Sequence, residues 1–110
     1  MATAELEARV RAGGDSVAIE LIGDIDGRAE AALDAAYAEV ESADAVLLDF
    51  SGVSYINSTG IALIVGLLAR ARKNGQTLSA AGLSQHYREI FEITRLADFM
   101  TIVDDQEDSA

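Results

Sequence analysis

A serine hydroxyl at the start of an expected helix is the first candidate for chemistry in this chain. Ser58 lies in the stretch Ile56-Asn57-Ser58-Thr59-Gly60, between a short apolar run at 46–48 and an apolar-rich segment at 61–71. The run has the length and residue types of a buried strand, with a turn expected after it, and the segment is typical of a helix. Ser58 or Thr59 is therefore predicted to be the N-cap, whose hydroxyl accepts from the free backbone N–H groups of the first turn.

The hydroxyl of Ser58 has two interpretations. In the first, it does no more than cap the helix. In the second, the strand–turn–helix junction presents it at a surface corner, where a kinase can phosphorylate it. The phosphate would then lie beside free N–H donors and the positive end of the helix dipole, where anions are tolerated. The spacing of the residues does not choose between the two.

The rest of the chain alternates strand and helix patterns. Residues 5–11 and 17–21 flank a Gly-Gly-Asp turn and alternate apolar and polar side chains, which predicts an antiparallel hairpin. Asp26 is placed to cap the helix that follows. Further on we expect a helix end at Gly75, a strand at 76–81, a short helix capped by Ser84 with Tyr87, Ile90, Phe91 and Ile93 facing inward, and a small strand at 100–103. This order predicts an α/β fold: a mixed sheet of four to five strands with helices packed against it.

A longer pattern around Ser58 resembles the signature of the STAS domain, and more narrowly that of the anti-sigma factor antagonists of bacterial partner-switching systems. It reads Asp49-x-Ser51-x-Val53-x-x-Ile56-Asn57-Ser58-Thr59-Gly60-Ile61-x-x-Ile64. In that family the serine in the position of Ser58 is phosphorylated by the anti-sigma factor, which is a kinase. The resemblance thus implies that Ser58 is the phosphoacceptor. Asn57 departs from the pattern, since the family usually has Asp there.

A second motif supports the same resemblance. Gly23-Asp24-Ile25-Asp26 is similar to the family's Gly-Glu-Leu-Asp, whose loop lies next to the phosphoacceptor and helps to form the partner surface. The resemblance covers about 17–103 and implies a STAS-like single domain. It also implies a partner-binding surface made of Asp24, Asp26, Asn57, Ser58, Thr59, Gly60 and Ile61. From the residues alone, the alternative is that Asp24 and Asp26 are ordinary capping and solvated charges.

Composition narrows the classes of function. The 110 residues fit one domain, for which we expect a folded core at 5–103 and a solvated acidic tail at 104–110. A net charge of −11, from 8 basic and 19 acidic side chains, disfavours binding to nucleic acid and to anionic membrane surfaces. The chain has no Cys for a disulfide or a thiolate metal site, no signal-peptide pattern, and no apolar run of the ~20 residues that a bilayer span needs. A cytoplasmic monomer without membrane insertion is expected.

An enzyme is not expected. His86 is the only histidine, and beside Tyr87 and Arg88 on a short helix it is expected to be a surface or boundary side chain, not a base or a ligand. The glycines form neither a P-loop nor a GxGxxG motif, and carboxylates in so acidic a chain are mostly solvated. We therefore expect no catalytic residue, no metal and no cofactor.

Two functions from different classes remain. The first is an antagonist that binds an anti-sigma kinase while Ser58 is unphosphorylated, releases it after phosphorylation, and is reset by a protein phosphatase. The second is a constitutive STAS scaffold subunit of a lipid-type ABC transporter or of a sensory complex, in which Ser58 is structural. Asn57 bears on the choice, because it lacks a charge that a kinase could read, although Asn also serves well at turns and caps. The single-domain length and an antagonist-like pattern towards the C-terminus favour the first function; that pattern comprises Leu83, Tyr87, Phe91, Thr94, Leu96 and Phe99.

Overall fold

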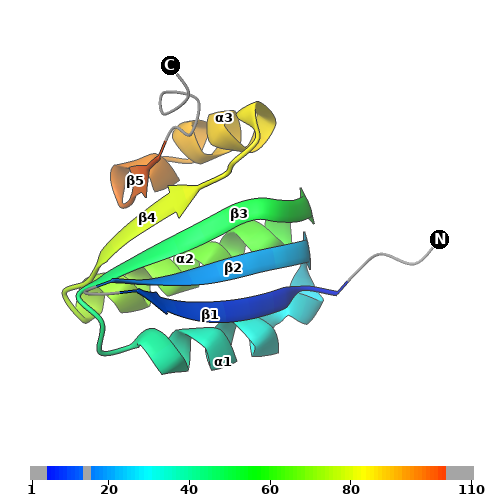
Figure 1. Ribbon diagram of the computed structural model, residues 1–110. Coiled ribbons are helices and arrows are strands. Elements are labelled where there is room, and N and C mark those ends of the chain that lie inside the picture. The colour runs from blue at the N-terminus through cyan, green and yellow to red at the C-terminus, as the bar shows by residue number, and fades with distance from the viewer. Residues whose placement is uncertain (1–4, 14–15, 104–110) are drawn as a thin grey trace, which may run out of the picture.

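The computed structural model describes residues 5–13 and 16–103 and contains a five-stranded sheet with helices between the strands (Figure 1). The elements follow one another as β1 (Glu7–Gly13), β2 (Ser16–Ile25), the 3-10 helix η1 (Gly27–Ala29), α1 (Glu30–Val40), β3 (Ala45–Ile56), α2 (Ser58–Lys73), β4 (Thr77–Ala81), α3 (Gln85–Ile93), the 3-10 helix η2 (Leu96–Asp98) and β5 (Thr101–Ile102). The tip of the expected first turn, at 14–15, and the acidic tail at 104–110 lie outside the described residues.

The order of strands in the sheet equals their order in the sequence, β1-β2-β3-β4-β5. β1 and β2 form the predicted antiparallel hairpin, whereas each later pair of neighbours is parallel. The prediction of an α/β fold with a mixed sheet is therefore confirmed. Parallel neighbours need a crossover connection, which η1 with α1, α2, and α3 with η2 supply. As a result, the carboxyl ends of β2, β3 and β4 meet at one edge of the sheet, and the loops that follow them gather there.

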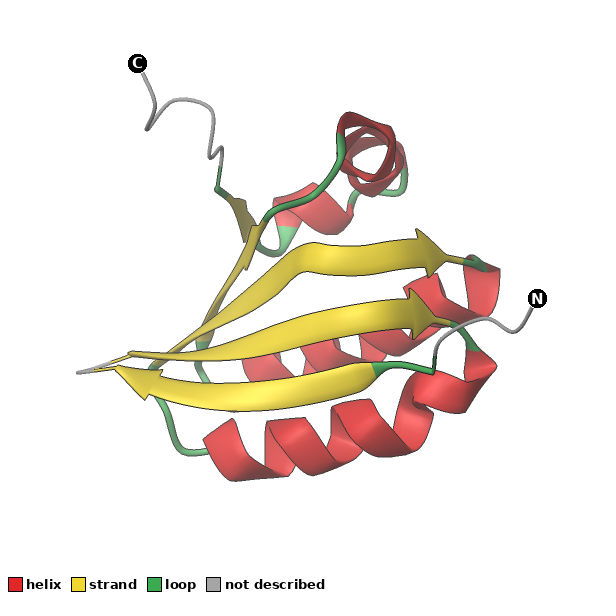
Figure 2. Cartoon of the chain, turned by 45° about the vertical axis from the view of Figure 1, so that its right-hand side comes forward, coloured by secondary structure: helices red, strands yellow, loops and turns green. Residues whose placement is uncertain are grey.

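The helices cover one face of the sheet. Figures 1 and 2 show α1 and α2 side by side on that face. Alternate residues of β3 are buried there, at Val46, Leu48 and Phe50, while Leu47 and Asp49 between them are only partly covered. This period of two is typical of a strand with one buried face, and it places the hydrophobic core between sheet and helices.

α3 joins the same core through an aromatic contact. Phe91 is fully buried, and its ring meets that of Phe50 edge-on, with 5.8 Å between the centroids. Tyr87 and Ile90 are partly buried, as predicted. The prediction that Ile93 also faces inward is wrong, since this residue is 79% exposed. Two positions along a helix differ by about 200° around its axis, so Phe91 and Ile93 cannot share a face.

β3 is longer than the sequence predicted. The expected turn after Phe50 does not form, because the strand continues to Ile56. Its pairing with β2 shifts register twice, and each shift adds one residue to β3. Bulges of this kind bend a strand without ending it. At the first bend, the Asp49 carboxylate accepts hydrogen bonds from the backbone N–H and the hydroxyl of Ser51, at 2.9 and 2.7 Å.

Two glycines of α2 have opposite surroundings. Gly60 is buried, and a Cβ atom there would lie 1.9 Å from the carbonyl oxygen of Ile25. Glycine at this position lets the helix approach the end of β2. Gly66 is exposed in the middle of the same helix, and apart from its chain neighbours and the nearby backbone of α2, a Cβ atom there would meet no atom of the described chain within 4 Å. Since glycine in a helix interior is less stable than alanine, Gly66 weakens α2 without a packing reason inside the described chain.

Alanine at these two positions should therefore change stability in opposite directions. Gly66→Ala should raise the free energy of unfolding by about 0.5–1 kcal/mol, because it removes the backbone freedom of glycine from the unfolded chain. Gly60→Ala should lower it by about 1–3 kcal/mol or more, because α2 and β2 must move apart. Urea unfolding followed by circular dichroism measures both. A loss of stability in Gly66→Ala, or none in Gly60→Ala, would contradict the packing described above.

Candidate functional site

The ends of β2 and β3 bring two loops into contact. These strands are parallel neighbours, and their last residues, Ile25 and Ile56, pair with each other. The next residue, Asn57, donates its backbone N–H to the carbonyl of Ile25 at 3.2 Å. The loop from β2 into η1 and the junction from β3 into α2 therefore lie side by side at the carboxyl edge of the sheet. The two sequence motifs meet at this edge.

Asn57 caps α2, so the prediction of Ser58 or Thr59 as the cap is wrong. The backbone of Asn57 is extended, and its side-chain Oδ1 accepts from the backbone N–H of Gly60 at 2.8 Å. Asn is among the best N-cap residues, and because Asn57 makes the capping hydrogen bond, Ser58 takes no part in it. Ser58 is the first residue of the helix, Thr59 is the second, and both are exposed. Ser58 is exposed, and within the described chain no hydrogen bond engages its hydroxyl.

The first turn of α2 packs closely on the loop after β2. Besides the tight approach of Gly60 to Ile25, a Cβ atom at Gly27 would touch the side-chain methyl of Thr59 at 3.6 Å. Ile61 is partly buried, and its backbone N–H donates to the carbonyl of Asn57 at 2.9 Å. Two of the residues predicted to bind a partner are therefore not fully accessible. Gly60 is buried and packs on Ile25, and the side chain of Ile61 is only partly exposed.

The two aspartates of the neighbouring loop have different environments. Asp26 caps η1 as predicted: its carboxylate accepts from the backbone N–H of Arg28 at 2.9 Å and pairs with the guanidinium of Arg28 at 2.9 Å. The side-chain hydrogen bond from Arg28, followed by the backbone one, lowers the pKa of Asp26, and the same side-chain bond raises the pKa of Arg28. Asp24 is 5% exposed, so the interpretation of this residue as a solvated charge is wrong. Its side chain offers little area to a partner.

One residue that steadies the site was not singled out from the sequence for this role. The hydroxyl of Tyr87, on α3, accepts a hydrogen bond from the backbone N–H of Ile56 at 2.9 Å. This bond ties α3 to the last residue of β3, immediately before the cap. No spacing in the sequence links Tyr87 to a strand end 31 residues earlier, so only the folded chain reveals the contact. His86 beside it is exposed, as predicted, and its ring contacts that of Tyr87.

The arrangement favours negative charge at Ser58. The first turn of α2 contains no acidic residue, and its backbone N–H groups and helix dipole stabilise an anion at this end. Within residues 5–13 and 16–103, no group of three or more His, Asp and Glu side chains is placed to hold a metal ion. None of the helices in these ranges is both long enough and apolar enough to span a membrane.

Comparison with protein families identifies the domain to which this fold belongs. A family model described as "Mlab, STAS domain" matches residues 8–104, which is most of the chain. The chain belongs to the STAS domain family. The resemblance found in the motifs around Asp26 and Ser58 is thereby confirmed at the level of the domain.

Anti-sigma factor antagonists are among the relatives of this STAS domain. It is 37% identical over 57 residues to anti-sigma-B factor antagonists of Staphylococcus epidermidis and Staphylococcus aureus, a match that covers 52% of this chain and 53% of each relative. The chain thus spans about half the length of the curated relatives it matches.

Two solved structures share the fold. An anti-sigma factor antagonist from Mycobacterium paratuberculosis superposes with a TM-score of 0.72 at 22% identity, over 94% of this chain and 90% of that one. The anti-sigma factor antagonist SpoIIAA in its unphosphorylated form superposes with a TM-score of 0.69 at 17% identity, over 88% of this chain and 87% of that one. The five-stranded architecture of this STAS domain is therefore the architecture of known antagonists.

The stability of this STAS domain should depend on pH through Asp26. Because the pKa of Asp26 in the folded state is below its ordinary value, its stabilisation is present above about pH 4 and is lost as the pH falls through the lower folded value. Asp26→Asn keeps a capping side chain but removes the ion pair. Its free energy of unfolding should fall less than that of the wild type between about pH 6 and about pH 2, as measured by urea unfolding. Equal losses in the two proteins would contradict the role of the Asp26–Arg28 pair.

Proposed function

We propose that this STAS domain is an anti-sigma factor antagonist that acts by partner switching. The unphosphorylated domain binds an anti-sigma kinase, and phosphorylation of Ser58 releases it. The observation that carries the proposal is the exposed Ser58 hydroxyl at the first position of α2, where Asn57 and not the serine makes the cap bond. A kinase can modify this hydroxyl without breaking the start of the helix. The names of the Staphylococcus relatives support the class of partner.

The proposed partner surface is centred on Ser58. Thr59 lies beside it, and Asp26 contributes from the adjoining loop. The surface continues along the exposed side of α2. Asn57 and Ile61 are partly buried at its margin, while the buried residues Asp24 and Gly60 support it from beneath.

Phosphorylation changes the charge at the centre of this surface. A phosphoserine carries about −1.5 to −2 charges at pH 7. The loss of a polar contact together with the cost of desolvating this charge inside the interface, about 3 kcal/mol in all, weakens binding roughly a hundredfold. The helix itself tolerates the phosphate, because its first turn holds no acidic residue and its dipole favours an anion there. The partner is thus released without refolding of the domain.

A protein phosphatase returns the domain to its binding form in this proposal. The domain works as a cytoplasmic monomer, is not itself an enzyme and needs no cofactor. Its net charge of −11 favours a neutral or basic protein partner over nucleic acid or an anionic membrane.

One observation favours a second function. The family model that matches this chain is described as "Mlab, STAS domain", and the description does not name an antagonist. The alternative is therefore a constitutive scaffold subunit of a lipid-type ABC transporter or of a sensory complex, in which Ser58 is structural. The complete cap made by Asn57 suits that role as well, because it needs no carboxylate next to the serine.

Substitutions at Ser58 test the switch. Ser58→Asp should lower affinity for the anti-sigma kinase by about tenfold or more, because it places a negative charge at the centre of the surface. Ser58→Ala should bind the kinase like the wild type and should stay bound when ATP is added, because it has no hydroxyl to phosphorylate. Thr77→Asp is the matched control, since Thr77 is exposed at the start of β4, at the opposite end of the sheet. Calorimetry measures the affinities. Wild-type binding by both Ser58 variants would refute the proposal at its centre.

The phosphorylation itself separates the two functions. Incubation with candidate anti-sigma kinases and ATP, followed by mass spectrometry, should locate one phosphate on Ser58. A chain that no cognate kinase modifies and that copurifies with a transporter ATPase would be the scaffold instead.

Asn57→Asp should raise the initial rate of phosphorylation, because it restores the carboxylate that the family usually has beside the acceptor. Asn and Asp are equally good caps, so the free energy of unfolding should stay nearly constant, which unfolding in urea checks. A rate equal to that of the wild type would show that the kinase does not read this carboxylate.

A further inference from the structure

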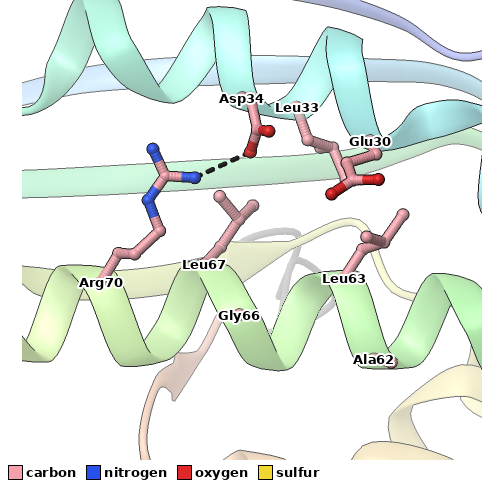
Figure 3. A pocket seen from close by; sticks show the side chains of 8 residues that line it. All are labelled: Glu30, Leu33, Asp34, Ala62, Leu63, Gly66, Leu67 and Arg70. Carbon is pink, nitrogen blue, oxygen red and sulfur yellow. Dashed lines mark hydrogen bonds and ion pairs between the residues drawn. The ribbon is translucent and has the colours of Figure 1, made fainter.

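A groove runs between α1 and α2, away from the phosphoacceptor. It encloses about 260 Å³, and buried Leu33 and Leu67 form its floor together with partly buried Leu63 (Figure 3). Figure 3 shows the carboxylates of Glu30 and Asp34 reaching over it from α1. The groove thus combines an apolar floor with an acidic rim.

The charges at the rim do not balance. Asp34 pairs with Arg70 across the groove at 2.7 Å, and the guanidinium of Arg70 also lies 4.6 Å from the ring centre of Tyr37. Those contacts hold Arg70 at one end. Glu30 is exposed, and among the ion pairs within the described chain none involves it. The rim therefore keeps one negative charge that a cation can compensate.

One side of the groove is open at Gly66, which has no side chain. This exposed helical glycine also lines the groove, and apart from its chain neighbours and the nearby backbone of α2, a Cβ atom there would meet no described atom within 4 Å. Glycine weakens the helix at this point, but it lets a second backbone or side chain come close to α2. No described segment of the chain uses that space.

We infer that this groove receives an arginine or lysine side chain from a helix of the protein partner, an inference that rests on the proposed function. The aliphatic stem of the cation would lie on Leu63 and Leu67, and its charged head would reach Glu30. The net charge of −11 attracts a basic partner surface in the same way. Gly66 allows the partner helix to cross α2 closely enough for the side chain to enter.

The groove and the phosphoacceptor fit within one interface. Ser58, Ala62 and Gly66 follow one another at intervals of four residues, so they lie along one side of α2. Eight residues of helix span about 12 Å, which is well within a standard protein–protein contact. The groove is thus a second contact site for the partner, and it stays open when Ser58 is phosphorylated.

Affinity measurements with groove variants test the inference. Gly66→Leu fills the groove, and Glu30→Arg reverses the charge at its rim. Each should weaken binding to the kinase that phosphorylates Ser58 by about tenfold or more. Glu39→Arg is the matched control and should stay within about twofold, since Glu39 is exposed about 180° around α1 from Glu30. Circular dichroism confirms that each variant is folded.

A footprint gives a second readout. The chain has no cysteine, so Gly66→Cys introduces a single thiol at the groove and Ala35→Cys a single thiol on the far side of α1. Excess kinase should slow alkylation of the thiol at 66 several-fold and leave that at 35 unchanged.

The outcomes separate the two proposals. Loss of affinity in both groove variants with protection at 66 supports the groove. Phosphorylation of Ser58 with wild-type affinity in the groove variants, or with no protection at 66, overturns the groove and leaves the switch intact. Failure of every cognate kinase to modify Ser58 overturns the switch and, with it, the groove as an anchor for that kinase.

Discussion

The close approach of α2 to the end of β2 is the contact on which the rest of the site depends. The carbonyl of Ile25 accepts from the backbone N–H of Asn57, and it leaves no room for a side chain at Gly60. A buried carbonyl needs such a donor, and here the donor belongs to the residue that starts the next helix. The junction after β3 is thereby held against the loop after β2. The position of Ser58 follows from this contact.

The cap divides two roles between neighbouring residues. Asn57 satisfies the N–H of Gly60, so the hydroxyl of Ser58 is not needed to hold the helix start. A serine that capped the helix would have to give up its bond whenever it was modified. Here the structural bond and the exposed hydroxyl belong to different side chains. Asp in place of Asn57 would make the same cap, so the departure from the family pattern changes the charge beside Ser58 without changing the geometry of the cap.

α2 does more than present Ser58. Its buried side closes the core through residues such as Ile64 and Leu68, and its first turn bears Ser58. The part that faces α1 stays open at Gly66, although alanine there would make a more stable helix. One helix thus combines a rigid inner face with an outer face that is not optimised for the stability of the isolated chain. That combination suits the binding of another protein that we propose.

The sequence by itself determined the alternation of strands and helices, the hairpin, the helix starts at Asp26 and Ser84, and the helix end at Gly75. These features depend on local patterns and on backbone preferences that neighbouring residues set. Only the tertiary structure decided that Asn57 is the cap, that Asp24 is buried, that β3 runs to Ile56, and that Tyr87 holds its end. Each of these depends on contacts between residues far apart in the chain, and the Ile25 carbonyl sets the position of α2 only once β2 and β3 lie side by side.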